Sequence, residues 1–136
     1  MKKIVRISFA TWILTVFLSM FWVWLACAEL VSRTFSISVA SGATTLQTVT
    51  LSGIPQVTLI QEVKVTIPDT TNNVTHTFFV IDPQDIERYS IATLAENVSH
   101  ILFPNRVIGD TYKFGVFPSA APGNNITIMI YVTFWR

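Results

Sequence analysis

ITIMIYVTFW, residues 126–135, is the stretch that decides the fold class of this 136-residue chain. A side chain that alternates between two faces at every second residue is typical of a β-strand. The apolar face comprises Ile126, Ile128, Ile130, Val132 and Phe134, and the opposite face ends in the aromatic Trp135. Two interpretations of this strand stay open. It is a central, buried strand, or it is a terminal strand that completes the sheet of a neighbouring molecule.

The same alternation occurs at the start of the region that follows residue 28. The apolar members are Val31, Phe35, Ile37 and Val39, and serines and a threonine lie between them. Arg33 interrupts this apolar face. We therefore expect a second terminal strand, and we regard it as a second candidate for strand addition to a neighbour.

Between these strands the chain alternates extended runs with turn signals. Runs at 44–51, 57–67, 74–81 and 111–117 are separated by Gly, Pro and Asn clusters. This spacing predicts a mainly β domain, an antiparallel β-sandwich of about six to eight strands. Within 57–67, the pattern places Leu59 on the apolar face and Ile60 on the polar face. The turn at 68–73 predicts a hairpin between 57–67 and 74–81.

One short helix is expected at 83–90. Asp82 can cap free backbone N–H groups, and Pro83 suits the first helical position. Asp85 and Glu87 would then lie at the positive end of the helix dipole. Residues 90–103 fit a helix and a strand about equally well, so their conformation stays open.

The first 28 residues indicate export. Lys2, Lys3 and Arg6 precede an uncharged stretch at 7–28, which places the N-terminus in the cytoplasm and the rest outside. Ala28 and Glu29 flank a candidate cleavage site of a signal peptide. The stretch is also long enough for a retained transmembrane anchor. The sequence around Cys27 matches a lipoprotein signal poorly. Because Cys27 is the single cysteine, the chain cannot form an internal disulfide.

The domain from 29 to 136 carries little charge. Eight acidic and six basic residues leave a balance near −2, and only 12% of the whole chain is charged. This gives no electrostatic footprint for nucleic acid. Three sequons make Asn73, Asn97 and Asn125 candidates for N-glycosylation.

No residue pattern indicates catalysis, a metal site or a cofactor. His76 and His100 are the two histidines, and neither has further ligands at a spacing typical of zinc sites. We expect His76 at an exposed or edge position and His100 on a loop or helix surface. Helix capping accounts for Asp82, Asp85 and Glu87 without an acidic site.

A chain that combines export, a Thr-rich β-sandwich and no internal disulfide is similar in outline to subunits of extracellular filaments assembled by strand donation. They also resemble small surface-layer or envelope proteins. The favoured hypothesis is a non-enzymatic structural protein that self-assembles at the cell surface. One alternative is an accessory subunit of a membrane complex, anchored through residues 7–28. Another is an adhesive or ligand-binding module that presents Tyr89, Tyr112 or the loop at 119–125.

Overall fold

The computed structural model describes residues 29–55 and 58–135, and the domain from Leu30 to Trp135 forms one compact unit. The expected signal or anchor segment at 7–28, with Cys27 and Ala28, lies outside the described residues. Among the described residues, no helix has the length and hydropathy needed to cross a membrane. Nine strands are described: β1 Leu30–Val39, β2 Gln47–Thr50, β3 Thr58–Ile67, β4 His76–Ile81, β5 Glu87–Leu94, β6 Val98–Leu102, β7 Val107–Ile108, β8 Lys113–Pro118 and β9 Ile126–Trp135.

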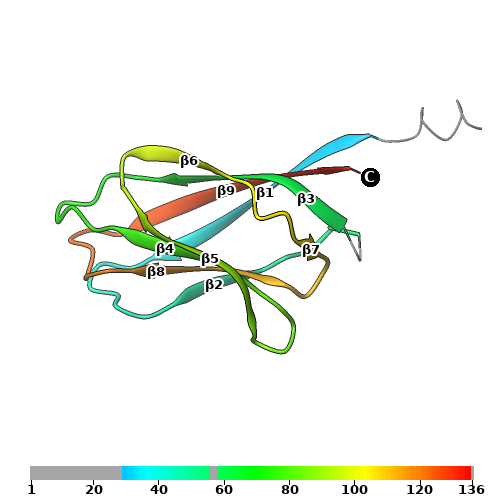
Figure 1. Ribbon diagram of the computed structural model, residues 1–136. Helices are drawn as coiled ribbons and strands as arrows, with labels where there is room; N and C mark the ends of the chain where they lie inside the picture. Colours follow the sequence, from blue (N-terminus) through cyan, green and yellow to red (C-terminus); the bar gives the residue numbers. More distant parts are fainter. Residues whose placement is uncertain (1–28, 56–57, 136) are drawn as a thin grey trace, which may run out of the picture. The chain divides into compact units, whose positions relative to one another are not determined.

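The strands form two antiparallel sheets that pack face to face, which confirms the β-sandwich (Figure 1). One sheet has the order β1-β9-β3-β6, with β7 also pairing with β3, and the other has the order β2-β8-β4-β5. The pairing is nested. The first strand pairs with the last, β2 with β8, β3 with β6 and β4 with β5. A long antiparallel hairpin rolled into two sheets gives this order, which is the topology of a jelly roll.

The core lies between the sheets and consists of the inward residues of both. Burial of alternate side chains along β9 is complete, since Ile128, Ile130 and Val132 are each 0% exposed. From the other sheet, Phe78 and Phe114 pack with ring centroids 5.3 Å apart. Burial of this apolar surface is the main favourable contribution to folding.

The predicted inward face of β3 is wrong over its first residues. The pairing of β3 with β9 shifts register between Ile60 and Glu62, which is a β-bulge. An extra residue on one strand reverses the side-chain alternation on one side of the bulge. Ile60 is therefore buried, whereas Leu59 is 44% exposed.

The predicted helix at 83–90 is also wrong. No helix occurs among the described residues, and β4 and β5 form a hairpin around residues 82–86. Asp82 does accept hydrogen bonds from the N–H groups of Gln84 and Ile86, both at 2.9 Å. Asp85, however, has a φ of 63°, in the left-handed region, so the chain turns back instead of continuing as a helix.

The hairpin predicted between the runs at 57–67 and 74–81 does not form. β3 and β4 belong to different sheets, so the segment between them crosses the end of the sandwich. Turn residues indicate a change of direction but do not determine whether the next strand stays in the same sheet. The stretch at 90–103, left open by the sequence, contains the end of β5 and all of β6.

Candidate interaction surfaces

The two terminal strands have different places in the same sheet. β9 lies between β1 and β3, so both of its edges are hydrogen-bonded. The candidate assembly residues of β9 (Ile126, Ile128, Ile130, Val132 and Phe134) are all core residues. The opposite face of β9 is partly exposed, with Tyr131 at 40% and Trp135 at 52%. Of the two interpretations that the sequence left open, the structure supports the central strand, with one face buried and the other partly exposed.

β1 is an edge strand. It pairs with β9 along all ten residues from Leu30 to Val39 without a register shift. No described strand pairs with its other edge. Of its candidate assembly residues, Ile37 and Val39 are buried, whereas Val31 and Phe35 are only partly buried. The Phe35 ring packs edge-on against Phe114, with centroids 5.8 Å apart.

The other sheet edges in the described domain are short or irregular. β2 has four residues and β6 has five. β5 has eight, but its pairing with β4 shifts register twice, and Thr93 has a φ of 59°. Short strands and bulges are common ways to stop sheet edges from pairing with other molecules. β1 differs from these edges because it is long, regular and open.

An exposed apolar row crosses the outer face of the sheet that contains β1, at the end where β1 begins. Leu30 lies opposite Trp135, and Leu59 lies opposite Val107. The pair of Ile60 with Phe134 makes Leu59 and Trp135 neighbours on adjacent strands. These four side chains, Leu30, Trp135, Leu59 and Val107, are between 44% and 53% exposed. Contiguous exposed apolar surface is typical of interaction sites, and the sequence pattern gave no sign of this row.

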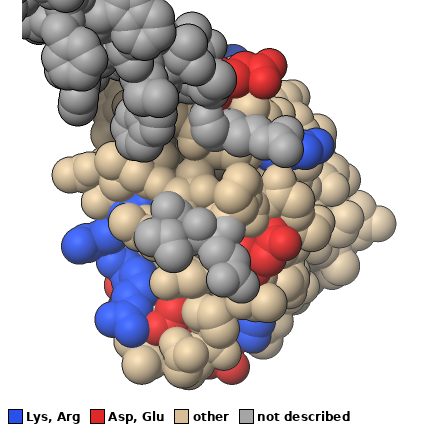
Figure 2. All heavy atoms as spheres, turned by 90° about the vertical axis from the view of Figure 1, so that its right-hand side faces the viewer, with Lys and Arg blue, Asp and Glu red and all other residues tan. Residues whose placement is uncertain are grey.

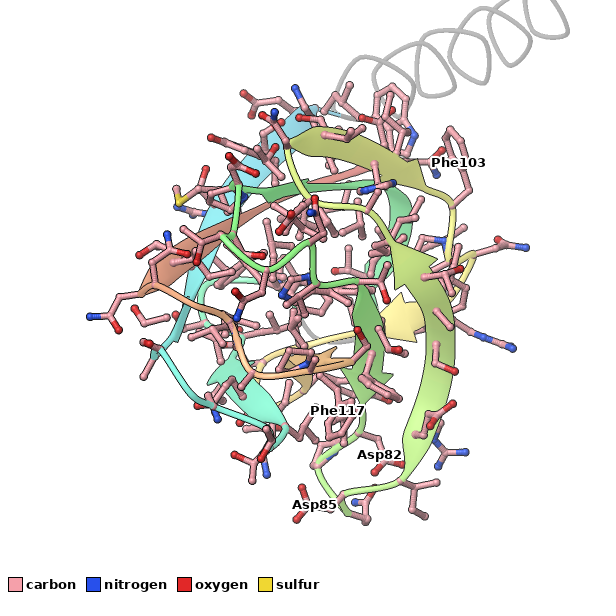
Figure 3. All side chains as sticks on the ribbon, turned by 90° about the vertical axis from the view of Figure 1, so that its left-hand side faces the viewer. Asp82, Asp85, Phe103 and Phe117 are labelled. Carbon is pink, nitrogen blue, oxygen red and sulfur yellow. The ribbon has the colours of Figure 1, made fainter. Side chains whose placement is uncertain are left out.

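Two further exposed aromatic side chains lie on different sheets (Figure 3). Phe103, 67% exposed, directly follows β6 in the sheet of the apolar row, and Phe117, 40% exposed, belongs to β8 in the other sheet. The sheet that contains β1 therefore presents the larger part of the exposed apolar surface.

The three sequons lie in loops at one end of the sandwich, opposite the end that holds the apolar row. Asn73 lies between β3 and β4, Asn97 between β5 and β6, and Asn125 just before β9. All three are exposed. The side-chain Oδ1 of Asn125 accepts a hydrogen bond from the N–H of Ser41 at 2.7 Å, which connects the chain after β1 to the chain before β9.

A buried polar cluster at the same end corrects the expectation for His76. This side chain is 1% exposed instead of lying at the surface, and neither ring nitrogen has a hydrogen-bond partner among the described residues. Burial lowers the pKa of His76 from its ordinary value, and the Glu96 carboxylate and the Val74 backbone oppose that shift. His100 lies on β6, not on a loop or helix, and its Nε2 is 2.7 Å from the carbonyl oxygen of Ala95.

Glu96 completes this cluster. Its Oε2 accepts hydrogen bonds from the backbone N–H of Thr70, at 2.8 Å, and from the Thr70 hydroxyl. The hydroxyl bond is the main reason that the pKa of Glu96 is lowered. Thr70 in turn accepts a hydrogen bond from the N–H of Val74. The cluster of Thr70, His76 and Glu96 secures the loop between β3 and β4. No local sequence pattern indicates it, because Glu96 lies 26 residues from Thr70 in the chain.

Asp82 and Asp85 lie at the β4–β5 turn (Figure 3), and each has a basic partner. Asp82, 1% exposed, forms an ion pair with Arg88 at 2.6 Å, and the exposed Asp85 pairs with Lys113. Burial raises the pKa of the Asp82 carboxyl, but hydrogen bonds from Ile86, Arg88 and Gln84 outweigh it, so the pKa is lowered overall. Within residues 29–55 and 58–135, no group of three or more His, Cys, Asp or Glu side chains could hold a metal ion.

Tyr89 and Tyr112, the candidates for a ligand-binding surface, are both partly buried against the core. Tyr112 lines a shallow hollow with Glu87, Arg88, Arg106 and Val107. The loop at 119–125 is held by hydrogen bonds to its neighbours, including those between Ser119 and Thr75.

On the face shown in Figure 2, charges of both signs occur among mostly uncharged residues, so no single-sign patch dominates it.

No family model matches the chain, and no curated protein matches its sequence. Solved structures do share the fold. A chain of the cyanophage Pam1 capsid superposes with a TM-score of 0.58 at 18% identity, over 79% of this chain and 85% of that one. A protein of Bacillus endospore appendages, described as disulfide-linked pili, has a TM-score of 0.50 at 11% identity, over 79% and 88% of the two chains. At these identities the likeness shows the fold alone.

Proposed function

We propose that this chain is a non-enzymatic structural protein, the self-assembling subunit of a filament, sheath or layer outside the cytoplasm. The observation that carries the proposal is the open edge of β1, which is ten residues long and uninterrupted. An edge of this kind exposes a row of backbone N–H and C=O groups that another strand can pair with. Its exposure is reasonable in a protein whose function is to associate.

The apolar row supports the same proposal, because it provides a second surface on the same sheet. A subunit with two separate contact surfaces can form extended assemblies, whereas one self-complementary surface gives only a closed pair. The two proteins of similar fold come from a capsid and from pili, and their place in assemblies supports the proposal. The expected export segment at 7–28 supports a location at the cell surface, with the membrane contacted by that segment if it is retained.

Electron microscopy of the full-length chain, purified in mild detergent and then diluted out of it, tests the proposal. We expect regular filaments, sheets or closed particles. A control variant with Thr34→Lys and Ser36→Lys adds charge to the edge of β1 and should suppress them. Dispersed single particles at all concentrations would contradict the proposal, and N-terminal sequencing of native material would show whether the chain is cleaved before Glu29.

A further inference from the structure

The length of β1 restricts what can pair with its open edge. The other edges of the described domain offer two residues in β7, four in β2, five in β6, and eight residues with two register shifts in β5. Only a second β1 matches the ten regular residues of the first. Like-with-like antiparallel pairing across a two-fold axis would therefore satisfy the largest number of backbone groups.

The side chains of β1 are compatible with such pairing. Its outer face carries Ser32, Thr34, Ser36 and Ser38, and the strand has one charged residue, Arg33. Antiparallel pairing of two identical strands would place hydroxyl groups opposite hydroxyl groups on this face. Only a register centred on Arg33 would bring like charges directly opposite each other, which is destabilising.

The inner face near the edge is incompletely covered. Val31 and Phe35 of β1 and Val49 of the adjacent β2 pack against the core but remain partly exposed. In contrast, Ile37 and Val39 of the same strand are buried. A second copy at this edge would cover the exposed parts of these side chains, and Phe35 lies near the middle of the strand.

We propose that β1 pairs antiparallel with β1 of a second copy about a two-fold axis that passes through Phe35. This inference rests on the proposed self-assembly and identifies the pairing of β1 with β1 as one contact between subunits. The paired positions are Val31 with Val39, Ser32 with Ser38, Arg33 with Ile37, Thr34 with Ser36, and Phe35 with itself. Two aromatic rings meet at the axis, a favoured cross-strand pair, and Leu30 stays free within the apolar row. The closed pair then presents two such rows for further association.

Variants of β1 with opposite charges test whether two copies pair through this edge. In full-length protein in detergent, Thr34→Glu/Ser36→Glu places carboxylates opposite carboxylates, and Thr34→Lys/Ser36→Lys places amines opposite amines. We expect each variant alone to self-associate at least tenfold more weakly than the natural chain in sedimentation velocity. An equimolar mixture should recover the association, because the carboxylates of one copy then face the amines of the other across the pair of Thr34 with Ser36. Recovery also shows that both variants are folded.

Ser90→Glu/Ala92→Glu is the matched control, because both positions are exposed and lie two residues apart on the edge strand β5. We expect its association to stay within threefold of the natural chain. If the natural chain associates and all variants associate equally well, the β1 pairing is wrong although self-assembly stands. If the natural chain itself remains monomeric, the proposed function fails.

Distance measurement tests the register. A nitroxide on Ser38→Cys, in a Cys27→Ser background, reports the separation between the two copies in pulsed electron spin resonance. At about 3.4 Å per residue, an axis at Phe35 predicts about 21 Å between the Cα atoms. Axes at Thr34 and Ser36 predict about 28 Å and about 14 Å. A distribution centred on either value, or the lack of a defined distance in an associated sample, would overturn the register.

Discussion

β9 and β1 have nearly the same pattern of alternating apolar residues, yet they have opposite positions in the sheet. β9 pairs on both edges and contributes its whole apolar face to the core, whereas β1 pairs on one edge and has no partner on the other among the described strands. A periodic pattern specifies that a strand forms and which face is buried. It does not specify how many neighbours the strand has, because that depends on pairing between distant segments. Under the proposed function, β9 stabilises the domain and β1 provides the edge for association.

The largest expected effect is the difference in unfolding free energy lost when a side chain is truncated in β9 and in β1. Ile130→Ala removes a side chain that is 0% exposed, and we expect it to reduce the free energy of unfolding by about 2–5 kcal/mol. Val31→Ala, at the partly buried start of β1, should cost roughly 1 kcal/mol or less in dispersed protein. Urea unfolding followed by circular dichroism measures both. Equal losses would show that β1 is as much a core strand as β9.

The next effect is a change of folding stability with pH, which self-association should not share. Because the pKa of His76 is lowered in the folded state, the unfolded chain binds more protons near its ordinary value of 6.5. The free energy of unfolding should be constant above that value and fall as the pH drops below it, by at most about 1.4 kcal/mol per pH unit. The edge of β1 carries no group that titrates between pH 5 and 8, so self-association should not follow this change.

His76→Leu sharpens that test. The substitution removes a buried group whose nitrogens have no hydrogen-bond partner among the described residues, so stability at pH 7.5 should not decrease. The fall in stability between pH 6.5 and 5 should disappear. A pH profile that keeps its shape in the variant would assign the dependence to another group.

The smallest effect concerns the connection between the two strands. Asn125→Gln removes the hydrogen bond to Ser41 and should cost about 0.5–1.5 kcal/mol in unglycosylated protein. Thr127→Val destroys the same sequon at an exposed strand position and leaves Asn125 intact, so its cost should lie within about 0.5 kcal/mol. Mass spectrometry of native protein tests the sequon, because both variants should lose the same glycan. Unchanged masses would count against its use.

Sequence patterns predicted the sandwich and its terminal strands because alternation is a local property. The extended run predicted at 111–117 corresponds to β8, in which Phe114 and Val116 are buried. Errors arose where one local signal has two outcomes. Asp82 accepts N–H hydrogen bonds in the hairpin turn as it would at a helix start. The left-handed conformation of Asp85 and the hydrogen bond from the Asp82 N–H to the Ile86 carbonyl distinguish the turn from a helix.

Other features depended on contacts that no local pattern contains. The bulge after Ile60, the burial of His76 and the pairing of Leu59 with Val107 all result from the sheet order. That order connects the first strand with the last, the longest sequence separation in the domain. The apolar row and the open edge of β1 could therefore be recognised only in the folded chain.

Hydrogen exchange of the full-length chain, measured by mass spectrometry in dispersed and associated samples, tests the assignment of β1 and β9 most directly. We expect peptides covering Ile126–Trp135 to be equally protected in both samples, because both edges of β9 are paired within one molecule. Peptides covering Leu30–Val39 should exchange faster in the dispersed protein and gain protection on association. If association leaves exchange in β1 unchanged, or protects β9 instead, the edge of β1 is not the assembly surface.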